Sequence, residues 1–364
     1  MEDRSRRRPP APGCGLDAVA EGGACKPVVV GKVRDEEVTF PSSVPDKGLT
    51  RLRGTLSIPD APGKRPAVIL LHGSGPQDRD APIPGDLVSR VSPPFPVLRA
   101  LGEVFARAGL VVLRWDKRGP KNYPELGAGG AAARFHFSDF EQDGRDAIAW
   151  LATRPEVDPG AIVVAGHSEG GGLVAHVAAG DRRVAGVVLF GGYVDVFDAA
   201  AWQIGNHART RLRQADLVGF GALSFMASRQ RHCIEKLGTA EYDPNEKCIG
   251  GSPTQAQVKE VVAYESHTLE RLASLDVPIM AIQGSVDRNI DPSTLPRLAK
   301  TLDGRDVELH YVTRLNHLLV DVVDGPSPPV LDPRIGALVK TFVGTLRRRE
   351  PAGEGIKGTG RPTP

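Results

Sequence analysis

Residues 161–174 read AIVVAGHSEGGGLV, and this stretch decides the fold. Its apolar, β-branched run Ile162–Val164 is long enough for one buried strand but too short for a helix. The run leads into a G-x-S-x-G sequence centred on Ser168, after which an apolar helical pattern begins. Glycines two residues before and after the serine allow a tight turn that lifts its hydroxyl clear of the sheet. The stretch therefore predicts a nucleophile elbow. The alternative is a glycine-rich turn whose serine only caps the helix.

On both sides of this stretch, apolar strand candidates alternate with segments of helical length. The alternation predicts parallel strands joined by helical crossovers, and hence an α/β fold with a mostly parallel, twisted sheet and helices on both faces. Three more segments with alternating apolar positions predict antiparallel edge strands: Val28–Val33, Glu37–Phe40 and Leu49–Ile58. The expected parallel strands are Ala67–Leu71, Leu110–Trp115, Ile162–Ala165, Val184–Phe190, Val277–Ile282 and Val307–Val312, and the clearest helices are Pro96–Ala108, Asp139–Ala152 and Pro292–Leu302.

Composition along the chain divides it into a two-part core, an insertion and two tails. The tails are rich in Pro and Gly, so we expect both to be disordered. The expected segments are a disordered start (1–26), the first part of the core (27–193), an insertion (194–267), the second part of the core (268–346) and a disordered tail (347–364).

The insertion is too long to be a simple connection between two strands. Much of it carries apolar side chains at helical spacing, among them Phe220 and Phe225. We expect a helical lid over the site, with these two phenylalanines binding substrate in an apolar pocket. The alternative is an extra packing subdomain with no part in binding.

The charge balance argues against nucleic acid as a partner. The chain of 364 residues has 46 basic and 44 acidic side chains, a formal net charge of +2. No apolar run is long enough to span a bilayer. No C-x-x-C or histidine-rich spacing suggests a zinc site, and we expect neither metal nor cofactor. No feature of the sequence indicates an oligomeric state.

The four cysteines fall into two local pairs, Cys14 with Cys25 and Cys233 with Cys248. Two short disulfide loops would favour an oxidising, extracytoplasmic compartment, whereas four unrelated thiols would fit a reducing cytosol. Arginines at positions 4 and 6–8 resemble the start of a signal peptide, but prolines follow where its apolar core would be. We therefore expect no targeting segment within the chain.

A serine nucleophile needs a base, and the base needs an orienting carboxylate. His317 follows the last expected strand in a short loop, and Asp287 follows the neighbouring strand. Reacting groups gather at the carboxyl ends of parallel strands, so we expect these two residues to serve Ser168. Asp195 is the second candidate for the acid, and Asp291 precedes Pro292 where a helix cap is expected. A loop histidine with no catalytic role is the alternative for His317.

Acyl transfer also requires hydrogen-bond donors for the developing oxyanion. One expected donor is the backbone N–H of Glu169, the residue after the nucleophile. The second is expected from the loop His72–Asp80, where glycines let the backbone turn inward. Ser74 is the first choice there and Gly75 the second.

Five motifs together resemble the α/β-hydrolase superfamily over about residues 28–346. They are HGSGPQDRD (72–80), LRWDKRG (113–119), GHSEGG (166–171), IQGSVDR (282–288) and LNHLL (315–319). They are similar to a bacterial branch of serine esterases and acyl hydrolases related to dienelactone hydrolases, thioesterases and serine peptidases. The resemblance implies an α/β-hydrolase fold, the same site roles and no cofactor. The sequence departs from these relatives at Pro120–Asn122 and in the insertion.

The predicted function is hydrolysis of a small-molecule carboxylic ester through an acyl-enzyme on Ser168. Thioester hydrolysis or acyl transfer would use the same groups. A peptidase is less favoured, because about 60 residues before His72 cannot form the N-terminal propeller of many peptide-cleaving relatives. A binding protein of the same fold without turnover is the alternative from another class.

Overall fold

The computed structural model describes residues 18–21, 24–27, 30–44, 49–85, 90–126, 137–248, 254–321 and 329–349. Its centre is an eight-stranded sheet in the order β12-β11-β10-β9-β5-β8-β4-β3. The pairs β3–β4 and β4–β8 are antiparallel, and every other neighbouring pair in this sheet is parallel. The strands are β3 (Val33–Pro41), β4 (Arg51–Pro59), β5 (Arg65–Leu71), β8 (Val111–Trp115), β9 (Val157–His167), β10 (Val184–Phe190), β11 (Ile279–Gly284) and β12 (Val307–Val312).

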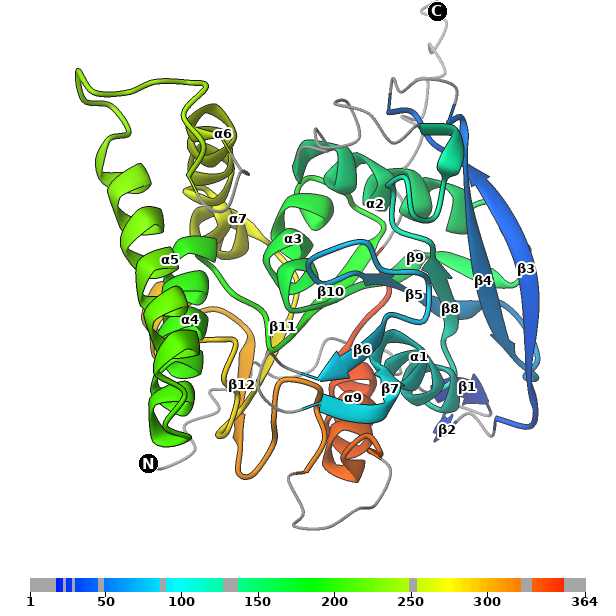
Figure 1. The fold of residues 1–364 in the computed structure, drawn as a ribbon. Coiled ribbons are helices and arrows are strands. Elements are labelled where there is room, and N and C mark those ends of the chain that lie inside the picture. Colours follow the sequence, from blue (N-terminus) through cyan, green and yellow to red (C-terminus); the bar gives the residue numbers. More distant parts are fainter. Residues whose placement is uncertain are drawn as a thin grey trace, which may run out of the picture.

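Helices cover both faces of the sheet, as the alternation of strands and helices predicted (Figure 1). On β5, Ile69 and its alternate neighbours belong to one apolar core, whereas Val68 and Leu70 belong to the other. This division follows from the two-residue repeat of a strand. One face carries α2 (Phe137–Leu151), α3 (Glu169–Ala178), α7 (Thr268–Ser274) and α8 (Thr294–Thr301), and the other carries α1 (Val97–Arg107) and α9 (Pro333–Thr345).

In its described residues, 194–248 and 254–267, the expected insertion contains the helices α4 (Val196–Arg213), α5 (Leu217–Glu235) and α6 (Gln255–Glu265). Figure 1 shows α4 and α5 side by side at one edge of the molecule. Asp216 caps α5 by accepting a hydrogen bond from the Gly219 N–H, and a capping box formed with Thr254 begins α6. A disulfide joins Cys233 to Cys248, with the two Cα atoms 5.5 Å apart.

The structure differs from the sequence-based expectations at two hairpins. The first, β1 (Ala18–Glu21) with β2 (Ala24–Pro27), lies within the segment expected to be disordered except for its last residue, so the structure differs from that expectation at 18–21 and 24–26. The Gly-Gly pair between them is a hairpin signal that the Pro- and Gly-rich composition masked. The second, β6 (Pro82–Gly85) with β7 (Arg90–Pro96), was missed because prolines argue against strands, although an isolated two-stranded pair tolerates them.

Smaller differences concern the start of the sheet and one short turn. A strand was expected over Val28–Val33, but residues 30–32 are not in a strand, and β3 begins at Val33. Residues 28–29 and Cys14 lie outside the described part of the chain. A short 3₁₀ turn, η1 (Pro124–Leu126), precedes α2. Within the described ranges, no helix is long and apolar enough to cross a membrane.

Candidate active site

Ser168 lies in a strained turn between the end of β9 and the start of α3. Its φ of 58° and ψ of −119° are unusual for a residue with a side chain. The turn is this tight because two glycines let backbones touch: a Cβ on Gly166 would lie 2.1 Å from the Gly170 carbonyl oxygen. A Cβ on Gly170 would lie 2.3 Å from the carbonyl oxygen of Leu71. The sequence motif and the local geometry therefore agree on a tight strand-to-helix turn with Ser168 at its apex.

His317 and Asp287 come together at the ends of neighbouring strands. The Nδ1 atom of His317 lies 2.9 Å from Oδ2 of Asp287, and both residues are buried. The other oxygen, Oδ1, accepts hydrogen bonds from the backbone N–H groups of Asn289 (2.7 Å) and Ile290 (3.0 Å). The Asp287 carboxylate is therefore fixed from both sides, and it fixes the ring of His317 in turn.

The other two candidate acids have different surroundings. Asp291 accepts a hydrogen bond from the Ser293 N–H at 2.8 Å, but α8 begins at Thr294 and its cap position is Ser293, so the helix starts two residues later than the cap expected at Asp291. Asp195 is half-buried and follows β10 at the beginning of the insertion. The structure thus gives the contact with His317 to Asp287, the first choice of the sequence analysis.

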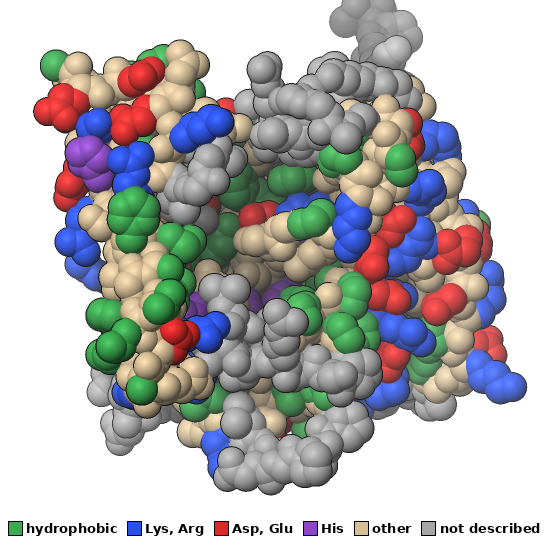
Figure 2. Space-filling view, in the orientation of Figure 1, with side chains coloured by type: hydrophobic (Ala, Val, Ile, Leu, Met, Phe, Trp, Pro, Cys, Tyr) green, Lys and Arg blue, Asp and Glu red, His purple; other side chains and the backbone are tan. Residues whose placement is uncertain are grey.

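A cavity of about 340 Å³ connects these groups. Ser168, His317 and Ser74 all line it. Figure 2 shows this face of the molecule hollowed between the α4–α5 region and the body of the sheet, with histidine side chains at the floor of the hollow. The volume lies within the range of small-molecule sites.

The wall of the cavity from the insertion is formed by α4 and not by α5. Ala199, Ala200 and Gln203 of α4 line it, whereas neither Phe220 nor Phe225 is among the described lining residues. Phe225 is 67% exposed. The helix that carries both phenylalanines packs against α4, so neither side chain lies at the described cavity, and their part in substrate binding stays a prediction.

His167, directly before the nucleophile, is a site residue that the sequence analysis did not single out. It is fully buried, and its Nε2 donates a hydrogen bond of 2.8 Å to the backbone carbonyl of His317. Burial, together with the nearby His317, lowers the pKa of His167 to about 3, so the ring stays neutral. A neutral ring that donates from Nε2 positions the backbone of His317. The position of His167 inside the elbow motif was the available signal.

Lys117 ties together the two segments that were expected to supply oxyanion donors. Its Nζ lies 2.6 Å from Oε1 of Glu169 and 2.8 Å from the carbonyl oxygen of Gly73. The Lys117 and Glu169 side chains are only 6% and 11% exposed. Glu169 is the first residue of α3, where backbone N–H groups are free of the helical ladder. On the other segment, Gly75 has a φ of +85°, which lets the loop turn sharply beside Ser74.

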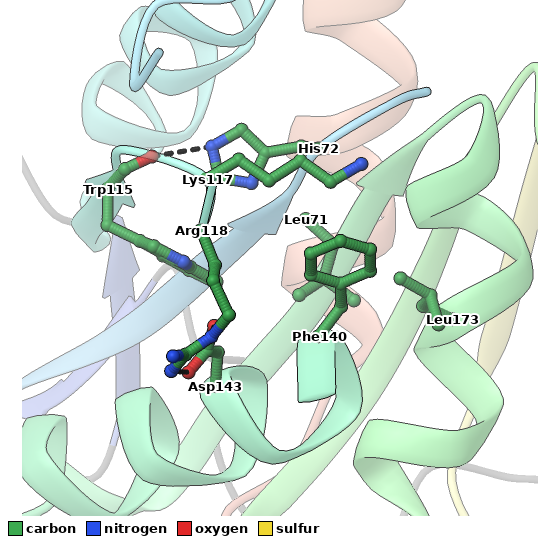
Figure 3. A pocket seen from close by; sticks show the side chains of 8 residues that line it. All are labelled: Leu71, His72, Trp115, Lys117, Arg118, Phe140, Asp143 and Leu173. Carbon is green, nitrogen blue, oxygen red and sulfur yellow. Dashed lines mark hydrogen bonds and ion pairs between the residues drawn. The ribbon is translucent and has the colours of Figure 1, made fainter. Parts of the chain in front are cut away.

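A small buried cavity behind this loop holds a second ion pair (Figure 3). Arg118 donates to both carboxylate oxygens of Asp143, at 2.6 and 3.0 Å. Burial outweighs this pairing and raises the pKa of Asp143 to about 6. Nearby, His72 Nε2 donates to the Trp115 carbonyl at 2.5 Å, and burial lowers the pKa of His72 to about 3. These contacts fix the base of the loop that begins at His72.

Comparisons with known proteins identify the family of the chain. The family model described as Hydrolase_4, serine aminopeptidase S33, matches residues 97–321. Esterase EstD of Thermotoga maritima is 26% identical over 313 residues, which is 85% of this chain and 68% of that protein.

Two solved structures show the likeness in fold. A structure of DcsB in complex with its substrate analogue has a TM-score of 0.51 at 17% identity, covering 85% of this chain and 99% of that one. The monoclinic form of the Pyrobaculum calidifontis esterase has a TM-score of 0.50 at 16% identity, covering 86% and 85%. Together with the family match, these likenesses confirm the expected α/β-hydrolase fold.

Proposed function

Because the chain belongs to the Hydrolase_4 family, which is described as serine aminopeptidase, S33, we propose that it is a carboxylic ester hydrolase with Ser168 as nucleophile. The observation that carries the proposal is the contact between His317 and Asp287 at the cavity that Ser168 also lines. The likeness to Esterase EstD supports an ester as the substrate class.

In this mechanism Asp287 accepts a hydrogen bond from the Nδ1–H of His317, which holds the tautomer whose Nε2 is the basic nitrogen. His317 removes the proton from the Ser168 hydroxyl as its oxygen attacks the ester carbonyl carbon. The tetrahedral intermediate collapses when His317 gives that proton to the departing alcohol oxygen. A water molecule then attacks the acyl-enzyme in the same way, which releases the acid and restores the Ser168 hydroxyl.

The oxyanion is held by the backbone N–H of Glu169 and by that of Ser74, with Gly75 as the alternative. A backbone donor at this position typically contributes a factor of about 10²–10³ in kcat. Lys117 supports this role because it binds both the Glu169 side chain and the carbonyl of Gly73, directly before Ser74. We assign it a positioning role: it keeps the two donors at a fixed separation.

The insertion, residues 194–267, acts as a lid through α4. Ala199 and Gln203 line the cavity, which supports contact between this helix and substrate. The outer helix, α5, then serves to hold α4 in place and has no direct contact with substrate.

The test is Ser168→Ala, measured on short p-nitrophenyl esters and with a fluorophosphonate probe. The variant should lose kcat by about 10⁶-fold, as removal of a nucleophile does in related machinery, and should not be labelled. Ser224→Ala, on the exposed side of α5, is the matched control and should keep both signals. Turnover or labelling retained in Ser168→Ala would contradict the proposal.

A second candidate function follows from the family description, which names an aminopeptidase. Peptide bonds use the same serine chemistry, so substrate preference decides between the two functions. The preference is measured as kcat/KM for an ester, for the matched aminoacyl p-nitroanilide at the same concentrations, and for an acyl-CoA as the thioester substrate. We expect kcat/KM for the ester to exceed both others. A higher value for the anilide would assign the chain to peptide hydrolysis.

A further inference from the structure

Gln283 is a buried polar side chain that the mechanism above does not use. It is the residue before the last of β11 and is only 2% exposed. Its strand lies between β10 and β12, and Gln283 is in register with Tyr311 of β12. The backbone that carries this side chain is therefore part of the sheet and is held by it.

The side-chain amide of Gln283 reaches the far end of the loop that follows β11. Its Nε2 donates hydrogen bonds to the backbone carbonyl oxygens of Ile290 (3.1 Å) and Asp291 (3.0 Å). An amide nitrogen has two N–H donors, so it can serve both acceptors. The two carbonyls also determine which way the amide faces, because its own oxygen would be repelled by them. Asp287 lies within the loop that these bonds close.

Ile290 connects this contact to the catalytic groups. Its carbonyl accepts from Gln283, and its N–H donates to Oδ1 of Asp287 at 3.0 Å. The other oxygen of that carboxylate, Oδ2, lies 2.9 Å from Nδ1 of His317. A continuous series of hydrogen bonds therefore runs from the sheet, through Gln283 and Ile290, to Asp287 and His317.

The opposite end of the Gln283 amide argues against a role in stability alone. Its Oε1 is buried and has no hydrogen-bond partner among the described residues. An unpaired buried oxygen costs free energy that an apolar side chain of the same length would avoid. Local features that oppose stability are expected chiefly at functional sites. The donating end of the amide is then the part that the site requires.

From these contacts we propose that Gln283 is a positioning residue for the hydrolysis. It holds Ile290 and Asp291, and through them it holds the Asp287 carboxylate at the place where that group meets His317. Gln283 is not among the described residues that line the cavity, so it acts without touching substrate. The inference rests on the proposed function and adds to it a residue that controls the catalytic acid.

The first test is Gln283→Met, which keeps the length of the side chain and removes both donors. Displacement of a catalytic group by about 1 Å can cost about 10²-fold, so kcat should fall about 10- to 10²-fold. KM should stay the same, because no contact with substrate is lost, and kcat/KM should therefore fall by the same factor as kcat. A wild-type kcat, or a change confined to KM, would overturn the proposal.

The matched control is Gln230→Met. Gln230 is a second buried glutamine with an unpaired Oε1, but it lies in α5 and is not among the described lining residues. The control should keep both kcat and KM. An equal loss of kcat in the two variants would show that any buried glutamine replaced in this way lowers activity, and it would contradict a specific role for Gln283.

Gln283→Glu tests the hydrogen bonds with a side chain of the same shape. Burial against two carbonyl oxygens should raise the pKa of the new carboxyl above its ordinary value of about 4.3. While protonated, the carboxyl can donate one hydrogen bond; once ionised, it repels both carbonyls. Its kcat/KM relative to the wild type at the same pH should therefore exceed that of Gln283→Met at about pH 6 and lose this advantage by about pH 9. Equal activity of the two variants at every pH would contradict the role of the donors.

Proton NMR separates failure of the positioning role from failure of the proposed function. In Ser168→Ala, which needs no turnover, the Nδ1 proton of His317 is observed as a far-downfield resonance and is assigned by its loss in His317→Gln. Adding Gln283→Met should abolish this resonance or speed its exchange with water at least about tenfold, whereas Gln230→Met should leave it unchanged. Such a loss supports the positioning role even if no ester is hydrolysed. An unchanged resonance contradicts it even if esters are hydrolysed.

Discussion

The floor of the cavity, meaning the Ser168 turn with His317 and Asp287, and the hairpin of α4 and α5 are stabilised by different kinds of contact. At the floor, glycines allow backbone contacts that no side chain would tolerate, and Asp287 and His317 are buried and bonded. On the hairpin, a Cβ added to Gly221 would meet nothing within 4 Å, and Val218 is 85% exposed. The floor is therefore specified by sterics and hydrogen bonds. The outer helix is specified mainly by its own helical pattern, its cap and one disulfide.

The largest loss of activity is expected when the acid that orients His317 is removed. Asp287→Asn should lower kcat about 10⁴-fold, because the amide favours the wrong tautomer of His317 while the geometry stays intact. Asp195→Asn and Asp291→Asn are the matched controls, and each should change kcat only a few-fold. Steady-state kinetics on one ester checks all three. A larger loss in Asp195→Asn than in Asp287→Asn would move the acid to the loop after β10.

The second largest effect on activity is expected from removing the contacts of Lys117 with Glu169 and Gly73. Lys117→Met leaves the Glu169 carboxylate buried without its partner, which typically costs about 3–5 kcal/mol in the free energy of unfolding. Displacement of the donors should also lower kcat by up to about 10²-fold. Urea unfolding and ester kinetics measure the two effects. Lys121→Met, with its exposed ammonium, is the control and should be nearly neutral; equal effects in both variants would contradict the tie.

Acid should weaken the floor before it affects the hairpin. His72 and His167 have folded pKa values of about 3, below the ordinary 6.5, so the unfolded chain binds more protons between these values. The stability they contribute is complete above pH 6.5 and is lost as the pH falls toward 3. At pH 5 the expected loss is about 2 kcal/mol for each residue.

The measurement is the free energy of unfolding in urea as a function of pH. His72→Gln should flatten the decline between pH 6.5 and 5, whereas His232→Gln on exposed α5 should leave the slope unchanged. Parallel curves for the wild type and His72→Gln would show that His72 is not kept neutral by burial.

The smallest effect is expected on the hairpin itself. Phe225→Ala removes a side chain that is 67% exposed, so the free energy of unfolding should change by less than about 0.5 kcal/mol. The ranking of ester chain lengths should also stay the same. Phe190→Ala, fully buried at the end of β10, is the matched contrast and should cost about 3–5 kcal/mol. A change in ranking with Phe225→Ala would return α5 to the substrate site.

Sequence alone predicted what local pattern determines. The strands around the elbow are continuous apolar runs, and Ser168, Asp287 and His317 follow strand ends, where the topology rule places reacting groups. The rule ranked Asp287 ahead of Asp195, and the contact with His317 agrees.

The remaining features depend on contacts between residues far apart in the chain. Lys117 reaches Glu169 across 52 positions, and no spacing rule links a lysine after one strand to a glutamate after another. Tyr193 and Asn289 looked like ordinary loop residues until the fold placed them on one cavity. For Phe220 and Phe225 the amphipathic pattern predicted a helix but not which neighbour its apolar face meets, and neither side chain lines the described cavity.

The Lys117 contact also has an evolutionary consequence. Lys117, Glu169 and Gly73 come from the ends of three strands, yet their positions depend on a single ammonium group. Losing either charge alone leaves the other buried without compensation, so the two positions are expected to change together across the family. Relatives without an acid after the nucleophile should also lack the lysine. Such paired replacement would mark lineages in which the oxyanion loop is held by some other contact.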